Sequence, residues 1–228
     1  MEQSQHLCRL CPRNCGVDRS RQTGFCKAGD KVKIARAALH FWEEPCISGE
    51  EVSGTVFFSG CPLQCVFCQN HQISAECYGK EISIERLSEI FLELQNQGAN
   101  NINLVTGGHF VPQIIQALDM VRRDLKIPVV YNSSGYETVE TLRMLKGYVD
   151  IYLPDIKYFA PECSRRYSHA PDYFEVASKA VQEMFSQVGA VEFDERGMLT
   201  KGVIVRHMVM PNGVEDSMDI LTWIAENL

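Results

Sequence analysis

Five short runs of apolar and β-branched residues recur along the chain from about residue 54, and each ends in a polar or glycine-rich turn. Strands that are covered on both faces have this near-continuous apolar pattern, rather than a strict alternation of apolar and polar positions. The pattern therefore predicts five buried strands, at 55–58, 101–106, 128–131, 149–153 and 202–210.

Helical periodicity fills the intervals between these runs. Apolar side chains recur every three or four residues, which places them along one face of a helix. Pro112 lies where a helix is expected to begin, and Asp172 followed by Glu175 resembles a capping box. The predicted helices span about 84–94, 114–121, 139–145 and 174–188, and a last one begins near 220.

Strands and helices that alternate in this order predict an α/β fold with a parallel sheet and right-handed crossovers. The polar strand ends then meet at one edge, which is where α/β sheets and barrels bind ligands. Residues 1–53 precede the first unit and carry their own cysteines, which predicts a small Cys-rich N-terminal extension before a domain spanning 54–228. Val191–Leu199 predicts a hairpin before the fifth strand.

The composition is near the globular average, with 45% hydrophobic and 22% charged residues. The net charge of −7 argues against a sequence-independent nucleic-acid binder. The chain has no apolar run long enough to cross a membrane and no secretory signal, so we expect a cytoplasmic protein. Ten cysteines in 228 residues are unusual, and in a reducing compartment such cysteines more often hold metal or do redox chemistry.

Three of these cysteines directly follow the first predicted strand, in Cys61-Pro-Leu-Gln-Cys65-Val-Phe-Cys68. Thiolates ligate iron–sulfur clusters, and because a cubane cluster normally takes four, three would leave one iron open to a substrate. A closed zinc site with His71 as the fourth ligand is the alternative. The position of the loop at the end of a strand favours the cluster, because barrels keep their chemistry there.

The C-x3-C-x2-C loop, with an aromatic residue before its third cysteine, resembles the signature of the radical S-adenosylmethionine (radical SAM) superfamily. The wider sequence resembles uncharacterised radical SAM proteins related to pyruvate formate-lyase activating enzyme, and this similarity covers essentially the whole chain. The segments that carry it are Cys11-Pro-Arg-Asn-Cys-Gly-Val-Asp-Arg19, Ala37-Ala-Leu-His-Phe-Trp-Glu-Glu-Pro45, Cys68-Gln-Asn70, Asn132-Ser-Ser-Gly-Tyr136 and Tyr152-Leu-Pro-Asp-Ile-Lys157.

The resemblance implies a partial (β/α) barrel of TIM type in which Cys61, Cys65 and Cys68 hold a 4Fe-4S cluster. S-adenosylmethionine would chelate the open iron, and its reductive cleavage would give a 5′-deoxyadenosyl radical that abstracts hydrogen. Such an oxidoreductase takes its electron from a donor such as flavodoxin or ferredoxin. Its partner would be a protein or small-molecule substrate, and activation of a glycyl radical enzyme is one role that the resemblance implies. Family barrels have six βα units and five are visible, so we expect a C-terminally truncated sequence.

The resemblance also assigns residues near the cluster to the binding of S-adenosylmethionine. Phe67 matches the aromatic residue of the family, which packs near the adenine; the alternative is an ordinary core aromatic. Gly107 and Gly108 stand where the superfamily often has Gly-Gly-Glu, with His109 in place of the glutamate. The two glycines allow close backbone approach to a ligand, and a simple turn is the alternative.

The ends of the later strands supply the remaining candidates. Asn132 and Ser134 have hydrogen-bonding groups suited to ribose hydroxyls or a carboxylate, or else they serve the turn itself. Asp155 and Lys157 resemble the Asp-x-Lys element of the activating enzymes, in which the lysine would neutralise the carboxylate of S-adenosylmethionine; a surface ion pair is the alternative. Of the adjacent Arg206 and His207, the resemblance favours His207 as the residue near the cofactor.

Four further cysteines, Cys8, Cys11, Cys15 and Cys26, lie within nineteen residues and offer a closed set of ligands for zinc or for an auxiliary iron–sulfur cluster. Cys46, Cys77 and Cys163 are isolated, and we expect them to behave as small hydrophobic residues. The alternative to a radical enzyme is a non-catalytic zinc- or cluster-binding module that serves interaction or electron transfer.

Overall fold

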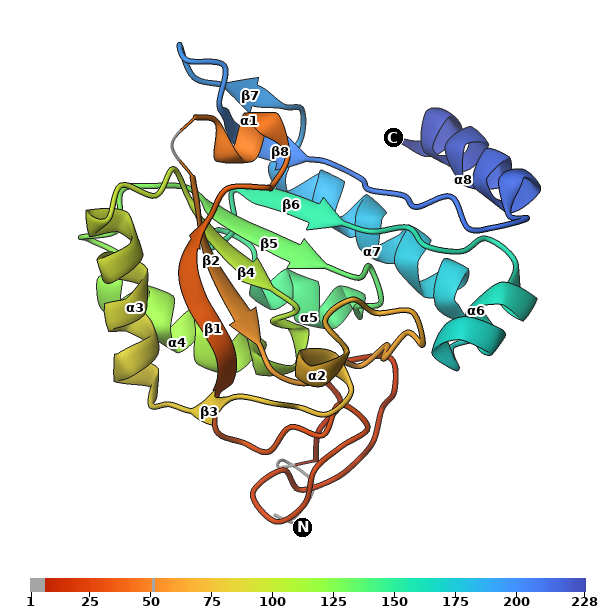
Figure 1. Ribbon diagram of the computed structural model, residues 1–228, viewed down its shortest axis with the longest axis horizontal. Helices are drawn as coiled ribbons and strands as arrows, with labels where there is room; N and C mark the ends of the chain where they lie inside the picture. Colours follow the sequence, from red (N-terminus) through yellow and green to blue (C-terminus); the bar gives the residue numbers. More distant parts are fainter. Residues whose placement is uncertain (1–6, 51) are drawn as a thin grey trace.

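The computed structural model describes residues 7–50 and 52–228, and its centre is one eight-stranded sheet (Figure 1). The strand order is β3-β1-β2-β4-β5-β6-β8-β7. The parallel strands are β2 (Ser53–Phe58), β4 (Ile102–Val105), β5 (Val129–Ser133), β6 (Ile151–Pro154) and β8 (Leu199–Val203). The antiparallel strands at the edges are β1 (Lys33–His40), β3 (Lys80–Glu81) and β7 (Glu192–Phe193).

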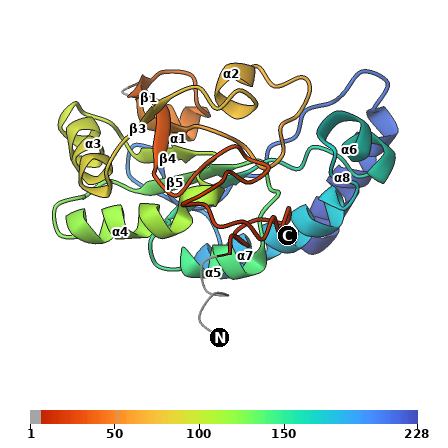
Figure 2. The same cartoon turned by 90° about the horizontal axis from the view of Figure 1, so that it is seen from below.

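Helices cover one face of this sheet, as Figure 2 shows. The covering helices are α3 (Ile84–Asn96), α4 (Val111–Val121), α5 (Val139–Met144) and α7 (Tyr173–Val188). The others are α1 (Pro45–Ser48), α2 (His71–Ser74), the 3-10 turn η1 (Gly108–Phe110), α6 (Pro161–Ser168) and α8 (Val214–Asn227). Within the described residues, no helix combines the length and the apolar character needed to cross a membrane.

Apolar side chains on the covering helices and on alternate strand positions form the main core. Phe91 of α3 and Ile114 of α4 are fully buried in the same cluster as Leu104 of β4 and Tyr131 of β5. Because successive strand residues point to opposite faces, the neighbours Asn103, Val130 and Asn132 face away from the helices. This alternation leaves the second face of the sheet free to build a site.

The predicted α/β fold with a mostly parallel sheet is confirmed, and so is the hairpin, which is formed by β7 and β8. The fifth predicted strand was misplaced. β8 ends at Val203, and beyond it Arg206 makes only an isolated bridge with Asp155. Ile204 and Val205 are apolar because they pack against two different hydrophobic clusters, and not because they continue the sheet.

Other local features also differ from the sequence prediction, including α8, which begins at Val214 and not near residue 220. Asp172 begins α7 without a capping hydrogen bond from its side chain, because its carboxylate instead accepts the hydroxyl proton of Tyr136 at 2.8 Å. Strand β1 was not predicted, although it pairs with β2 from Ile34 to His40. The segment 1–53 therefore contributes a strand to the central sheet.

The segment after β1 folds across the face of the sheet that the helices leave free. Helix α1 places the fully buried side chain of Ile47 in a cluster with Val130, Ile151 and Leu153. The side-chain amide of Asn101 donates to the carbonyl of Ile47 at 2.8 Å. This packing forms a second, smaller core and fixes the residues that precede α1.

We expect Ile47→Ala to lower the free energy of unfolding by about 2–5 kcal/mol, because it leaves a cavity in this second core. Denaturant unfolding followed by circular dichroism measures the change. Leu221→Ala is the matched control, since Leu221 is 52% exposed in α8, and it should change stability by less than about 0.5 kcal/mol. Equal effects of the two substitutions would contradict this account of α1.

Candidate functional site

A cavity of about 420 Å³ lies at the carboxyl ends of the parallel strands. The ends of parallel strands meet at one edge of a sheet, so residues distant in the sequence come together there. The cavity is lined by all three cysteines of the central loop and by most of the predicted cofactor-binding residues. Those residues are Cys61, Cys65, Cys68, Phe67, Asn132, Ser134, Asp155, Lys157 and His207.

The cysteine loop is held by its own backbone and by one buried side chain. Gln64 adopts a left-handed conformation, with φ of 49°, and Leu63 is fully buried beneath the loop. The backbone N–H of Leu63 points at the sulfur of Cys61 at 3.4 Å. Burial raises the pKa of the Cys61 thiol to about 12, although the N–H groups of Gln64 and Leu63 lower it. A thiolate here therefore needs a positively charged partner such as an iron ion.

The donor set fits a 4Fe-4S cluster with one open iron, because three thiols from one short loop line one cavity. Across residues 7–50 and 52–228, His, Cys, Asp and Glu side chains are not preassembled in threes around the position of a single metal ion. The ring of His71, the alternative zinc ligand, is more than half exposed. It faces Glu76 at 3.4 Å and is not among the residues that line the cavity.

Opposite charges meet along the cavity wall at the ends of β5, β6 and β8. The Lys157 ammonium donates to one oxygen of Asp155 at 2.6 Å, and Arg206 donates to the other at 3.1 Å. Arg206 also donates to the side-chain oxygen of Asn132 at 2.6 Å. Burial works against the charge of Lys157, but Asp155 outweighs it and raises the pKa of Lys157. Two cations therefore share the Asp155 carboxylate on this wall.

Arg206 lines the cavity, although the sequence resemblance favoured its neighbour His207 as the residue near the cofactor. His207 also lines the cavity, but both of its ring nitrogens are engaged by the protein. Nδ1 lies 2.6 Å from the carbonyl oxygen of Ile156, and Nε2 lies 2.8 Å from the Ser217 hydroxyl. A charged residue within an apolar run was the signal for Arg206, because such a residue needs buried partners.

Two glutamates just before α1 complete the surroundings of Arg206, and the sequence analysis missed both. The guanidinium lies 3.8 Å from Glu43 and 3.6 Å from Glu44. Burial raises the pKa of Glu43 to about 7, even though Arg206 lowers it. Their sequence signal was the acidic pair within the segment 37–45, whose partner lies far along the chain.

The residues after β4 serve the packing around the cavity. A side chain at Gly107 would collide with Ile114, and one at Gly108 would collide with the buried carboxylate of Glu137. Neither glycine is among the residues that line the cavity, although Thr106 is. His109 is buried with its Nε2 2.8 Å from the Ser59 carbonyl, and burial lowers its pKa to about 4. This neutral ring supports the end of β2.

The N-terminal cysteines lie in a loop that packs directly on the central cysteine loop. Cys11 and Cys26 are buried, and Cys8 and Cys15 are partly buried. Burial raises the pKa of the Cys26 thiol, and the neighbouring Cys8 and Cys15 add to this effect. Gln64 donates to the Phe25 carbonyl at 2.6 Å, which joins the two loops.

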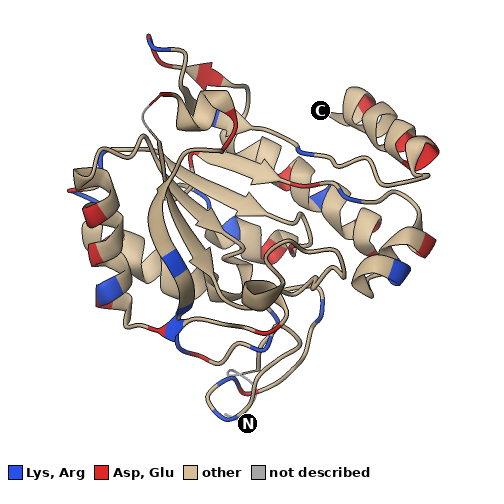
Figure 3. Ribbon diagram, viewed as in Figure 1, with Lys and Arg blue, Asp and Glu red and all other residues tan. Residues whose placement is uncertain are grey.

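Positive charge is concentrated around these N-terminal cysteines (Figure 3). Residues 7–33 contain seven Lys and Arg against two Asp, in a chain whose net charge is −7. Arg21 is paired with Asp18 at 3.5 Å, and Lys31 with Glu81 at 3.8 Å. Cations therefore outnumber the acidic residues of this segment.

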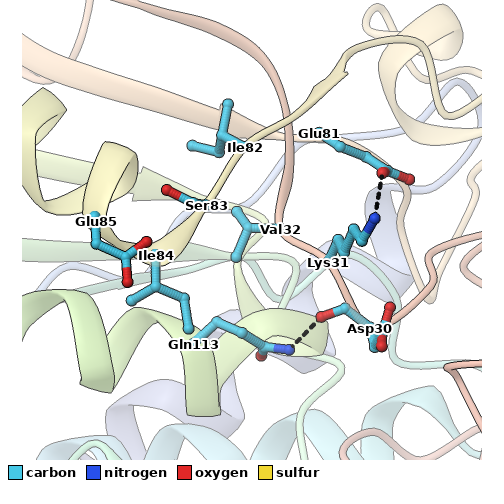
Figure 4. Close-up of a pocket in the computed structure, with 9 residues that line it drawn as sticks. All are labelled: Asp30, Lys31, Val32, Glu81, Ile82, Ser83, Ile84, Glu85 and Gln113. Atoms are coloured by element: carbon cyan, nitrogen blue, oxygen red, sulfur yellow. Dashed lines mark hydrogen bonds and ion pairs between the residues drawn. The ribbon is translucent and has the colours of Figure 1, made fainter.

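A second cavity, of about 570 Å³, lies elsewhere, between β3 and the beginning of α3 (Figure 4). The amide of Gln113 closes one side by donating to the carbonyl of Asp30 at 2.7 Å. It is lined by Asp30, Lys31, Val32, Glu81, Ile82, Ser83, Ile84, Glu85 and Gln113. None of these residues is a cysteine or a predicted cofactor-binding residue. The smaller cavity, which the three cysteines line, is therefore the candidate functional site.

Comparison with known proteins shows the family to which the chain belongs. The model of the radical SAM superfamily matches residues 55–223, and the chain therefore belongs to that superfamily. The chain is also 33% identical over 232 residues to an uncharacterized protein of Methanocaldococcus jannaschii. The aligned region covers 97% of this chain and 62% of that protein, so the chain spans less than two thirds of this relative.

The carboxyl group of Glu43 gives a testable dependence of stability on pH. The pKa of this carboxyl group is 4.5 when it is exposed to water, as in the unfolded chain, and about 7 in the folded protein. The folded state therefore binds more protons between these values, and stability falls as the pH rises through this window. We expect the free energy of unfolding of wild type to fall relative to that of Glu43→Gln between pH 4.5 and pH 7, by about 3 kcal/mol at most.

Denaturant unfolding of both proteins at several pH values measures this difference. The charged groups that face Glu43, namely Arg206, Glu44 and Asp155, are present in both proteins, so their own titration largely cancels. Parallel pH profiles for the two proteins would contradict the raised pKa.

Proposed function

We propose that this protein is a radical SAM enzyme that reductively cleaves S-adenosylmethionine in the cavity beside Cys61, Cys65 and Cys68. The observation that carries the proposal is that these three thiols line the same cavity as the polar residues at the strand ends. When bound, a 4Fe-4S cluster supplies the electron that splits S-adenosylmethionine into methionine and a 5′-deoxyadenosyl radical, which abstracts hydrogen from a substrate.

The residues of the cavity wall have separate tasks in this proposal. Lys157 neutralises the carboxylate of S-adenosylmethionine, and Asp155 holds Lys157 in place through the 2.6 Å ion pair. Asn132 and Ser134 offer hydrogen bonds to the ribose hydroxyls or to the carboxylate. Phe67 packs against the adenine and keeps water from the reacting atoms.

Anaerobic reconstitution with iron and sulfide tests the proposal. The wild-type protein should bind about four iron and four sulfide ions at the central loop, and with dithionite and S-adenosylmethionine it should release 5′-deoxyadenosine. Cys65→Ser should abolish this release by removing one of the three ligands. Cys46→Ser is the matched control, because Cys46 lies outside the cavity lining, and it should keep both the cluster and the activity.

The same experiment separates the enzyme from its alternatives. Zinc without sulfide at the central loop would identify a non-catalytic zinc module. A protein whose cluster is reduced by dithionite, but which releases no 5′-deoxyadenosine, would be an electron-transfer protein. Either result would overturn the proposed activity.

We also propose that the N-terminal cysteines hold a second metal centre, either zinc or an auxiliary cluster. Cys15 already accepts the backbone N–H of Phe25 at 3.3 Å, as ligating thiolates commonly do. The excess of cations over residues 7–33 suits the docking of an acidic one-electron donor such as flavodoxin or ferredoxin. If the centre is a cluster, it would relay that electron to the central loop.

Replacing Cys15 and Cys26 together with Ser should therefore lower the metal content by one centre. Elemental analysis for iron and zinc, with a sulfide assay, measures the loss. Cys163→Ser is the control and should leave the metal content unchanged. The N-terminal proposal fails if the double variant retains the full metal content of the wild type.

Two finer points stay predictions from the sequence, and only the first comes from the family resemblance. Activation of a glycyl radical enzyme requires the cavity to admit a glycine of a partner protein, and electron paramagnetic resonance of the mixed proteins would detect the resulting radical. A cytoplasmic location follows from the cysteine content, since a reducing compartment keeps such thiols free for metal.

A further inference from the structure

The sulfur of Cys65 accepts a hydrogen bond from a residue that lies 103 positions further along the chain. The hydroxyl of Ser168, the last residue of α6, donates to this sulfur at 3.0 Å. Ser168 is fully buried, and Cys65 is 8% exposed. Water therefore does not compete for this bond, which makes it an interaction inside the protein that bears directly on one of the three candidate ligands.

The hydrogen bond to Cys65 fixes the direction of a second one, between Ser168 and Tyr158. The phenol oxygen of Tyr158 lies 2.7 Å from the hydroxyl oxygen of Ser168. A serine hydroxyl has one proton, and that proton points at Cys65, so Tyr158 must donate its own proton to Ser168. The result is a chain from Tyr158 through Ser168 to the sulfur, and each bond in it polarises the next.

This arrangement is not the usual one for a serine in a helix. A helical serine normally donates to a carbonyl three or four residues earlier in its own helix. Ser164, one turn before, does this by donating to the Pro161 carbonyl at 3.1 Å. Ser168 gives up that local bond and points its proton out of the helix at the thiol.

The backbone around Ser168 is fixed to the cysteine loop from two sides. The N–H of Val66 donates to the Tyr167 carbonyl at 2.9 Å. Arg13, from the N-terminal loop, donates to the carbonyls of Ser168 and Pro62, each at 2.7 Å. The end of α6 and the cysteine loop therefore move as one unit, which keeps the hydroxyl on the sulfur.

We propose that Ser168, oriented by Tyr158, is a positioning residue that sets the reduction potential of the cluster held by Cys65. The inference rests on the proposed function, because it requires a cluster on the three cysteines. A hydrogen bond to a ligating sulfur stabilises the more negative, reduced state of the cluster and so raises its potential. The electron that cleaves S-adenosylmethionine comes from that reduced state, so the bond also determines how readily the cluster is reduced.

A redox titration of the reconstituted protein, followed by electron paramagnetic resonance, tests the proposal without relying on turnover. Ser168→Ala should shift the midpoint potential to a more negative value. Tyr158→Phe should shift it in the same direction by a smaller amount, because Ser168 keeps its proton but loses its orientation. Ser168→Thr should restore the wild-type potential, since it retains the hydroxyl.

Ser164→Ala is the matched control, because it removes a buried serine hydroxyl from the same helix without touching a cysteine. Its midpoint should equal that of the wild type. An unchanged midpoint in Ser168→Ala would overturn the inference, as would an equal shift in Ser164→Ala. If Ser168→Ala takes up no cluster, the Tyr158→Phe titration decides the matter.

Failure of this inference is distinguishable from failure of the proposed function. A wild-type protein that forms no cluster, or that forms one and releases no 5′-deoxyadenosine, overturns the proposed function. A wild-type protein that cleaves S-adenosylmethionine while Ser168→Ala keeps the same potential overturns only the role of Ser168.

Discussion

The guanidinium of Arg206 is largely shielded from water and is surrounded by acidic and polar side chains. The arrangement of the cavity wall at the ends of β5 and β6 depends on the pairing of this charge. Its partners come from three separate parts of the chain: Asn132 near the end of β5, Asp155 directly after β6, and the glutamate pair before α1. Because the Arg206 side chain is only 30% exposed, leaving its charge unpaired would carry a desolvation penalty, which the remaining exposure reduces. The contacts of Arg206 therefore connect β5 and β6 to the segment before α1, which crosses the open face of the sheet.

The same neutralisation determines what the cavity wall presents to a ligand. Asp155 is already shared between Arg206 and Lys157, so its carboxylate has little capacity left for a third cation. Lys157 in turn belongs to the cavity lining, with its ammonium group paired to Asp155. A polar network this strongly connected is rigid, and a rigid wall holds a ligand without further rearrangement. The cysteine loop on the other wall is equally fixed, through Leu63 and the hydrogen bonds to α6.

The features that the sequence predicted are those encoded locally. The apolar runs predicted the four earlier parallel strands to within two residues. The spacing of Cys61, Cys65 and Cys68 predicted three thiols that the structure brings to one cavity. Both signals lie within a few residues of each other in the sequence. The features that it missed depend on distant partners. Glu43 and Arg206 are more than 160 positions apart, and no local pattern pairs them. Helix α6 was missed because its exposed face is polar and only Ser164 and Ser168 are buried, so its apolar periodicity is weak.

The hydrogen bonds that hold the N-terminal loop against the end of α6 affect the order in which the protein folds during synthesis. Arg13 emerges early from the ribosome, but two of its acceptors, the carbonyls of Ser168 and His169, are made more than 150 residues later. Contacts of such long sequence separation form late in folding, since the intervening chain must first be ordered. Until α6 has been made and docked, the four N-terminal cysteines and the central three lie in loops that are still accessible. Metal ions from solution would therefore reach these cysteines most easily during this interval, before the closing contacts bury Cys11, Cys26, Cys61 and Cys65.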